Sequence, residues 1–96
     1  MYGQRVNGTK AKQMVASGAI LIDTRDAVKF RDGTIPGAIN LPLRRVSEMQ
    51  RHDRRVKFVV FGDGPDDDNA LQTAKYLGLY GFQEVYILES KEAWNK

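Results

Sequence analysis

Two short apolar runs dominate the hydrophobic pattern of the chain. Residues 19–23 read Ala-Ile-Leu-Ile-Asp, and residues 57–61 read Lys-Phe-Val-Val-Phe. Neither run alternates with polar residues as a strand with one wet face would, and both are rich in β-branched or aromatic side chains. This pattern predicts strands buried on both faces, as in a parallel sheet covered by helices.

Segments with helix or turn signals lie between and around these two strands. Thr9 is the expected N-cap of a first helix over residues 10–17, and Gly18 is its expected stop. The other predicted elements are a short helix over 26–31, a short strand over 38–41, a helical segment over 43–50, a helix from 70 to about 79, a strand over 84–88 and a last helical turn over 91–95.

This alternation of strands and helices indicates the class of fold. It predicts one α/β domain over residues 1–96, with a mostly parallel sheet flanked by helices. Asp23 is expected at the carboxyl end of a strand that pairs with the strand of residues 57–61. Ligand sites of such sheets lie beyond the carboxyl ends of the strands, so the loops after residues 23 and 61 are the candidate positions.

Composition narrows the chemistry that the chain can perform. Of its 96 residues, 42% are hydrophobic and 28% are charged, which is typical of a soluble globular domain. The chain has no cysteine, so disulfides, cysteine metal sites and thiolate reactions are excluded, and its single histidine excludes a multi-histidine metal cage. No apolar run approaches the ~20 residues that cross a bilayer, and the polar start lacks the apolar core of a secretory signal. We therefore expect a cytoplasmic protein with no membrane partner.

Charged residues are unevenly distributed, although the net charge is only +3. Residues 44–57 form a basic segment. Its acidic residues are Glu48 and Asp53, and its basic residues are Arg44, Arg45, Arg51, Arg54, Arg55 and Lys57. Because no aromatic residues are interleaved, we interpret this basic segment as a solvated face and expect no nucleic-acid partner. Residues 63–68, by contrast, include four aspartates and no basic residue.

The first half of the chain resembles the rhodanese-like domain family. Residues 21–26 read Leu-Ile-Asp-Thr-Arg-Asp and are followed by Phe30, similar to the family's IDxR strand end and its aromatic residue. Residues 33–42 read Gly-Thr-Ile-Pro-Gly-Ala-Ile-Asn-Leu-Pro, similar to the family pattern GHIPGAxNxP.

The second half extends the resemblance to almost the whole chain, from about Val6 to Trp94. Residues 74–77, 81–88 and 93–94 resemble the final helix, the last strand and the Ala-Trp ending of the family. The resemblance implies a five-stranded, mostly parallel sheet flanked by helices. It also implies sulfurtransferase chemistry at the loop after the central strand.

The sequence departs from the family at that loop. Gly62 stands where the family has its catalytic cysteine, Thr34 replaces a histidine, and the final Gly-Gly reads Glu89-Ser90. The loop is about two residues longer than the sulfurtransferase form and consists of Gly62, Asp63, Gly64, Pro65, Asp66, Asp67, Asp68 and Asn69. Since the cysteine would carry the sulfur as a persulfide, we predict no catalytic residue and interpret these residues as a degenerate active-site loop.

Carboxylates near this loop admit both a functional and a structural interpretation. Acidic oxygens suit Mg²⁺ or Ca²⁺, but the spacing does not match a calcium loop, and Asp or Asn at a helix start commonly caps free amides. We therefore expect Asp68 or Asn69 to cap the helix that begins near Ala70, and we predict neither a metal nor a cofactor. Asp23 and Arg25 are interpreted as the framework of the loop and not as catalytic groups.

The functional interpretation is a catalytically inactive rhodanese-like domain that serves as a binding or regulatory module. We expect a protein partner, and we expect the acidic loop to present its charges to a basic surface of that partner. The alternative is a sulfurtransferase-related enzyme or a sulfur-relay component that depends on a partner's thiol. The missing cysteine argues against any transferase that works alone.

Overall fold

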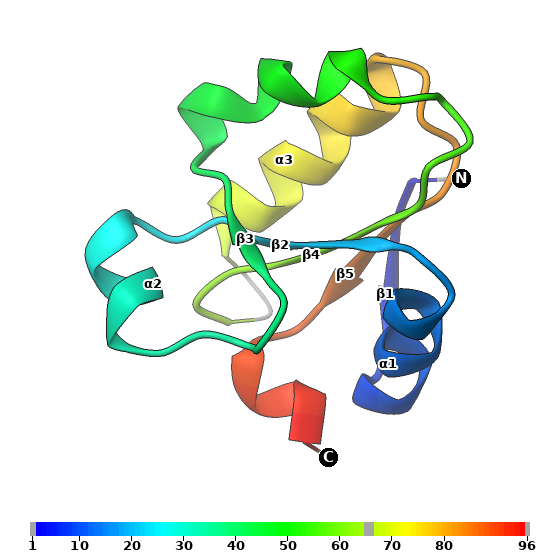
Figure 1. The fold of residues 1–96 in the computed structure, drawn as a ribbon. Coiled ribbons are helices and arrows are strands. Elements are labelled where there is room, and N and C mark those ends of the chain that lie inside the picture. Colours follow the sequence, from blue (N-terminus) through cyan, green and yellow to red (C-terminus); the bar gives the residue numbers. More distant parts are fainter. Residues whose placement is uncertain (1, 65–66, 96) are drawn as a thin grey trace.

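Five parallel strands form one sheet in the computed structural model of the chain, which describes residues 2–64 and 67–95 (Figure 1). The strands are β1 (Tyr2–Val6), β2 (Ile20–Asp23), β3 (Ile39–Asn40), β4 (Phe58–Phe61) and β5 (Val85–Leu88). Their order across the sheet is β1-β5-β4-β2-β3. Ile22 lies opposite Val60 and Asp23 lies opposite Phe61, which confirms the predicted parallel pairing of the two apolar runs.

Helices cover both faces of the sheet. The α-helices are α1 (Gly8–Ala16), α2 (Ala27–Asp32) and α3 (Asp68–Leu79), and the 3-10 helices are η1 (Leu43–Arg51) and η2 (Lys91–Asn95). Figure 1 shows α3 and η1 on one face and α1 and η2 on the other. The short helix α2 lies beyond the end of β2 and buries none of its residues. Among residues 2–64 and 67–95, no helix is long and apolar enough to cross a membrane.

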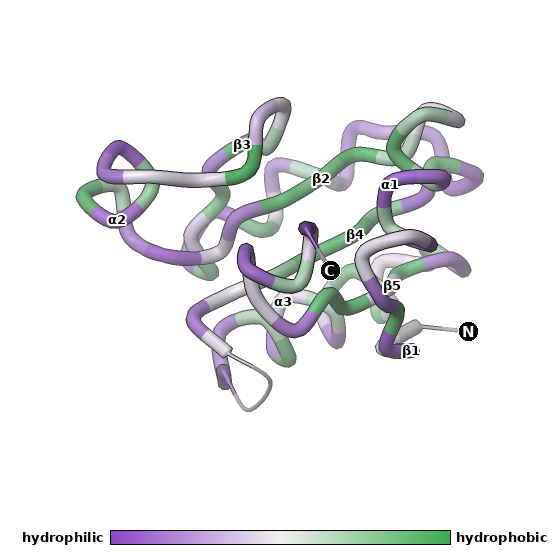
Figure 2. Tube along the Cα trace, turned by 90° about the horizontal axis from the view of Figure 1, so that it is seen from below, coloured by the Kyte–Doolittle hydropathy of each residue, from purple (hydrophilic) through white to green (hydrophobic). Residues whose placement is uncertain are grey.

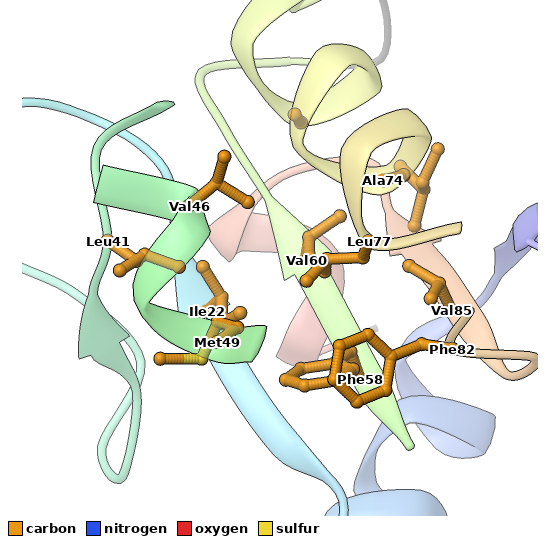
Figure 3. Packing of buried hydrophobic residues seen from close by; sticks show 12 residues of the cluster. Ile22, Leu41, Val46, Met49, Phe58, Val60, Ala74, Leu77, Phe82 and Val85 are labelled. Carbon is orange, nitrogen blue, oxygen red and sulfur yellow. The ribbon is translucent and has the colours of Figure 1, made fainter. Parts of the chain in front are cut away.

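Buried side chains fill the space on both sides of the sheet, because successive residues of a strand point to opposite faces. The cluster beneath α3 and η1 includes Ile22, Val46, Met49, Phe58, Val60, Leu77, Phe82 and Val85 (Figure 3). The cluster beneath α1 includes Ala11, Met14, Leu21, Val59, Phe61 and Leu88. Both faces of β2 and β4 are therefore apolar, which explains their uninterrupted hydrophobic runs, drawn in green in Figure 2.

The 3-10 helix η1 corresponds to the segment that was predicted as helical over residues 43–50. Val46 and Met49 are its buried residues, and Leu43 packs against the same cluster. A spacing of three matches the three residues per turn of a 3-10 helix, so these side chains align on one side. The hydrophobic spacing predicted a helix correctly but does not by itself distinguish the two helix types.

The two predicted helix N-caps were wrong, whereas Gly18 follows the C-cap of the first helix as predicted. Asn7, and not Thr9, caps α1: its backbone is extended and its Oδ1 accepts a hydrogen bond from the amide of Lys10 at 2.8 Å. Asp67, and not Asp68 or Asn69, caps α3, which begins before Ala70. In both helices the cap lies earlier than predicted, because the first turn includes polar residues that the apolar pattern does not mark.

The solvent face of α3 includes two large apolar side chains. Leu71 is 38% exposed and Tyr76 is 41% exposed. Thr73 instead lies on the buried face, together with Ala74 and Leu77.

The two edges of the sheet differ from its centre. At one edge, β3 contains only Ile39 and Asn40. At the other edge, the register of β1 shifts between Tyr2 and Gln4, and Gly3 between them has a φ of 83°. Strand β1 was not predicted, because its sequence Tyr-Gly-Gln-Arg-Val contains no apolar run and its position at an edge requires none.

Candidate functional site

The loop between β4 and α3 lies at the carboxyl edge of the sheet, as its place between a strand and a helix in the sequence predicted. β4 ends at Phe61 and α3 begins at Asp68, so residues 62–67 connect the buried strand to the helix (Figure 1). Two residues of the predicted site, Pro65 and Asp66, lie outside the described residues. The geometry of the loop therefore rests on residues 62–64 and 67–69.

The carboxylate of Asp67 is held inside this loop. Its Oδ1 accepts a hydrogen bond from the amide of Ala70 at 3.0 Å, and its Oδ2 accepts one from the amide of Asp63 at 2.9 Å. The Ala70 amide belongs to the first turn of α3, where unpaired amides and the helix dipole favour negative charge. A side chain of the protein thus supplies the anion that satisfies one loop amide and one helix amide.

Gly62 lies directly against this carboxylate. A Cβ on Gly62 would be 2.5 Å from Asp67 Cγ and 2.7 and 2.8 Å from the two carboxylate oxygens. Real Cβ atoms do not approach other atoms this closely, so any larger residue requires Asp67 to move. Gly62 stands at the position of the family's cysteine. The absence of its side chain therefore makes room for the carboxylate of Asp67, five residues later.

The other described acids of the loop lie towards its surface. Asp63 Oδ2 is 2.9 Å from Lys29 Nζ on α2, and both side chains are about half exposed. The hydrogen bond to Asp63 raises the pKa of Lys29 above its ordinary value. Asp68 is exposed in the first turn of α3. Within residues 2–64 and 67–95, no three His, Cys, Asp or Glu side chains are grouped so that they could hold a metal ion.

Asp23 and Arg25 form a buried ion pair at the end of β2. Arg25 Nη2 lies 2.8 Å from Asp23 Oδ2, Arg25 Nε lies 3.0 Å from Oδ1, and the hydroxyl of Thr34 donates to Oδ2 at 2.8 Å. Burial raises the pKa of the Asp23 carboxyl, but the hydrogen bonds from Arg25 and Thr34 outweigh this effect and hold the pKa below its ordinary value of 3.8. The carboxylate is therefore a stable anion that is fully surrounded by donors.

The same network fixes the backbone around it. Arg25 Nη2 also donates to the carbonyl of Gly33 at 2.6 Å, so the side chain spans the start and the end of the α2 segment. Asn40 Nδ2 donates to the carbonyl oxygens of Asp23 and Arg25 at 3.2 and 2.8 Å. Since Asp23 has no exposed surface, a substrate cannot reach its oxygens in this arrangement. These contacts hold the backbone in place at this edge of the sheet.

The basic segment is largely tied to the domain itself. The guanidinium of Arg54 donates to the carbonyls of Tyr80, Gln50 and His52 at 2.7, 2.8 and 2.6 Å, and it lies 4.7 Å over the ring of Phe82. The further ion pairs are Arg45–Glu48, Arg55–Asp53 and Lys57–Glu84. Much of the positive charge of this segment is therefore used in local contacts.

Sequence reasoning missed the particular roles of Asp67, Thr34 and Lys29. Asp67 is separated from Ala70 by three positions, which is the usual spacing between an N-cap and the amide that it accepts from, so the signal was present. It could not be resolved because Asp68 and Asn69 are equally good cap residues. The contacts of Thr34 with Asp23 and of Lys29 with Asp63 span 11 and 34 positions, and no local pattern encodes them.

The fold and the loop together define a class of protein, an α/β domain with a five-stranded parallel sheet and its site loop between the central strand and a helix. The family model of the rhodanese-like domain matches residues 8–96, and the chain belongs to this family. The absent cysteine and the filled loop are compatible with a member that does not transfer sulfur.

Solved structures of this class superpose closely on the domain. The BH2092 protein from Bacillus halodurans has a TM-score of 0.79 at 20% identity, and the match covers 97% of this chain and 72% of that one. The Alr3790 protein from Anabaena sp. has a TM-score of 0.78 at 25% identity, with 94% and 75% covered. CoADR-RHD from Bacillus anthracis has a TM-score of 0.76 at 20% identity, and the match covers 96% of this chain but 16% of that chain. A domain of this fold therefore also occurs within a much longer polypeptide.

Proposed function

We propose that this rhodanese-like domain binds or regulates a protein partner and does not transfer sulfur itself. The observation that carries the proposal is the position of the Asp67 carboxylate. It occupies amides of the loop in which the resemblance places the cysteine, and it lies against Gly62 where a side chain would otherwise project. The sequence has no thiol that could take over the reaction.

The chemistry of sulfur transfer supports this proposal. The reaction needs a thiolate that attacks a sulfur donor and retains the transferred sulfur as a persulfide. Methionine sulfur cannot ionise, and residues 62–69 include no serine or threonine. An anionic donor such as thiosulfate would also have to displace Asp67 from its amides and approach Asp63 and Asp68. Like charges about 4 Å apart repel by about 1 kcal/mol in water, and by more where water is excluded.

A relay in which the partner supplies the thiol is less compatible with the same geometry. A partner's persulfide would need free amides to stabilise it, and Asp67 already binds one amide of this loop and one of the first turn of α3. Binding without transfer requires no such rearrangement.

The proposed partner is a protein with a basic surface that faces the rim of the loop. Asp63 and Asp68 are exposed there, and among residues 2–64 and 67–95 only Lys29 forms an ion pair with Asp63. We propose a cytoplasmic setting and a protein in place of a nucleic acid, because most basic side chains of residues 44–57 are engaged within the domain.

An activity assay tests the negative part of the proposal. The purified domain should produce no thiocyanate from thiosulfate and cyanide above the background of a mock preparation. Gly62→Cys should restore little activity, because Asp67 occupies the loop and the neighbouring acids raise the pKa of a thiol. Steady thiocyanate production by the unaltered domain, after contaminating sulfurtransferases are removed, would overturn the proposal.

A binding assay tests the positive part. Immobilised domain should retain a defined protein from native lysate, identified by mass spectrometry, and the binding should weaken as salt is raised. Asp68→Asn should weaken it, whereas Lys75→Gln on the solvent face of α3 serves as a matched control. Equal retention by the Asp68→Asn variant at low salt would show that the loop is not the contact surface.

A further inference from the structure

A second concave site lies between η2 and the segment that joins α2 to β3. This groove has a volume of about 430 Å³ and is lined by Thr34 and Pro36 on one side and by Lys91, Glu92, Trp94 and Asn95 on the other. No described residue of the loop 62–69 belongs to its lining, although the groove shares Thr34 with the Asp23–Arg25 framework. We refer to it as the η2 groove.

Lys91 places a positive charge in this groove, and the described part of the chain gives it no close anionic partner. Its Nζ donates to the carbonyl of Gly33 at 3.1 Å, and its side chain is partly buried. No carboxylate within the described residues lies within 4.0 Å of this ammonium, in contrast to Lys29 and Lys57. The glycine at position 33 allows the close approach, because its Cβ would lie 3.1 Å from Lys91 Nζ.

A second cationic side chain meets Lys91 at the same acceptor. Arg25 Nη2 donates to the same carbonyl oxygen of Gly33 at 2.6 Å, so two cationic side chains converge on one neutral acceptor. Asp23 neutralises Arg25 through a buried ion pair. The ammonium of Lys91 has three donors, and among the described residues it makes one hydrogen bond, to the carbonyl of Gly33. The one acidic residue of the lining is Glu92, which is exposed at the rim.

Trp94 lines the same groove as Lys91. Its ring is partly buried, packs against the cluster beneath α1, and lies 5.7 Å from Lys12 Nζ. An aromatic side chain and an ammonium that line one groove suit a ligand with a flat apolar body and one anionic group, because burial of the body and a charge-assisted hydrogen bond act together.

We propose that the η2 groove binds a small organic carboxylate. The carboxylate accepts a hydrogen bond from Lys91 Nζ, and the apolar part of the molecule packs against Trp94 and Pro36. Asn95 also lines the groove and is exposed. The proposal is independent of the loop at residues 62–69, so it can hold whether or not that loop binds a protein.

The chain contains one tryptophan, which makes the test direct. Trp94 fluorescence is followed while the purified domain is titrated with benzoate, and in parallel with benzamide, its neutral isostere. Benzoate should change the fluorescence saturably and bind at least about ten-fold more tightly than benzamide, since a hydrogen bond to a charged group contributes more than a neutral one.

Three variants distinguish the groove from non-specific binding. Lys91→Gln should remove the preference for benzoate over benzamide, and Glu92→Gln should strengthen benzoate binding by removing a repulsive charge. Lys75→Gln, on the opposite face of the sheet, should leave both titrations unchanged. Equal affinity for the two probes, no saturable response to either, or an unaltered preference in Lys91→Gln would each overturn the proposal.

Discussion

The carboxylate of Asp67 packs against the α-carbon of Gly62, with 2.5 Å between its Cγ and the point where a β-carbon would lie. The reason for each of these two residues lies in the other. Glycine is not required there by a left-handed backbone, because the residues of positive φ are glycines at other positions. It is required because the carboxylate occupies the space, and the carboxylate stays there because two amides bind it.

A double-mutant cycle tests this dependence. Gly62→Ala should destabilise the domain by about 1–3 kcal/mol through steric overlap. Asp67→Ala should cost about 1 kcal/mol through loss of the N-cap. In the double variant the added methyl no longer meets a carboxylate, so the combined cost should be clearly smaller than the sum. Urea unfolding of the four proteins measures this, and strictly additive costs would contradict the contact.

The pairing of β2 with β4 makes the centre of the sheet sensitive to small changes in volume. Val60 has no exposed surface and packs in the cluster beneath α3. Val60→Ala should lower the free energy of unfolding by about 1–4 kcal/mol through lost burial and a cavity. Leu71→Ala, on the exposed side of α3, is the control and should change it by less than about 0.5 kcal/mol. Similar losses for both variants would be inconsistent with the observed packing.

Acid should weaken the framework at the end of β2. The folded-state pKa of Asp23 lies below 3.8, so its ionised form stabilises the domain above about pH 4, and this contribution is lost as pH falls through the folded-state pKa. Asp23→Asn should cost about 3 kcal/mol at neutral pH, because it leaves the partly buried Arg25 without its counter-charge.

The difference in urea midpoint between the wild-type domain and Asp23→Asn should therefore shrink as the pH is lowered from about 5 to about 3. Glu48 and Asp53 also have lowered pKa values, but both proteins retain them, so their effect cancels in the comparison. A difference that is constant over this range would show that the carboxylate does not titrate with folding.

Arg54 should act as a structural residue in spite of its exposure. Its guanidinium links the end of η1 to the carbonyl of Tyr80, so Arg54→Ala should destabilise the domain by about 1 kcal/mol. Arg44→Ala removes an arginine for which the structure describes no such bonds, and it should be nearly neutral. Thermal unfolding of the two variants makes the comparison, and equal melting temperatures would argue against the role of Arg54.

The sequence was sufficient for the fold where burial is continuous. The runs before Asp23 and Phe61 are apolar at every position because both of their faces are covered, and this pattern distinguishes them from other elements. Strand β1 lacks the signal since an edge strand needs little burial. The family resemblance added the number of strands, which hydrophobic periodicity alone did not provide.

The candidate site was predictable in position but not in detail. The order of strand, loop and helix placed residues 62–69 at the carboxyl edge of the sheet. The inward turn of Asp67 depends on which of three neighbouring polar residues becomes the cap, and that choice is made by the packing of α3. The contacts of Asp23 with Thr34 likewise depend on the path of the segment around α2.

The edges of the sheet restrict how this domain can associate with other molecules. A two-residue β3 offers almost no template for a further strand, and the irregular register at Gly3 interrupts the template that β1 would offer. Edges of this kind resist the strand addition through which sheets aggregate or capture extended peptides. Recognition by this domain should therefore involve side chains and loops and not the addition of a strand. At high concentration the folded domain should stay dispersed and not form edge-to-edge polymers.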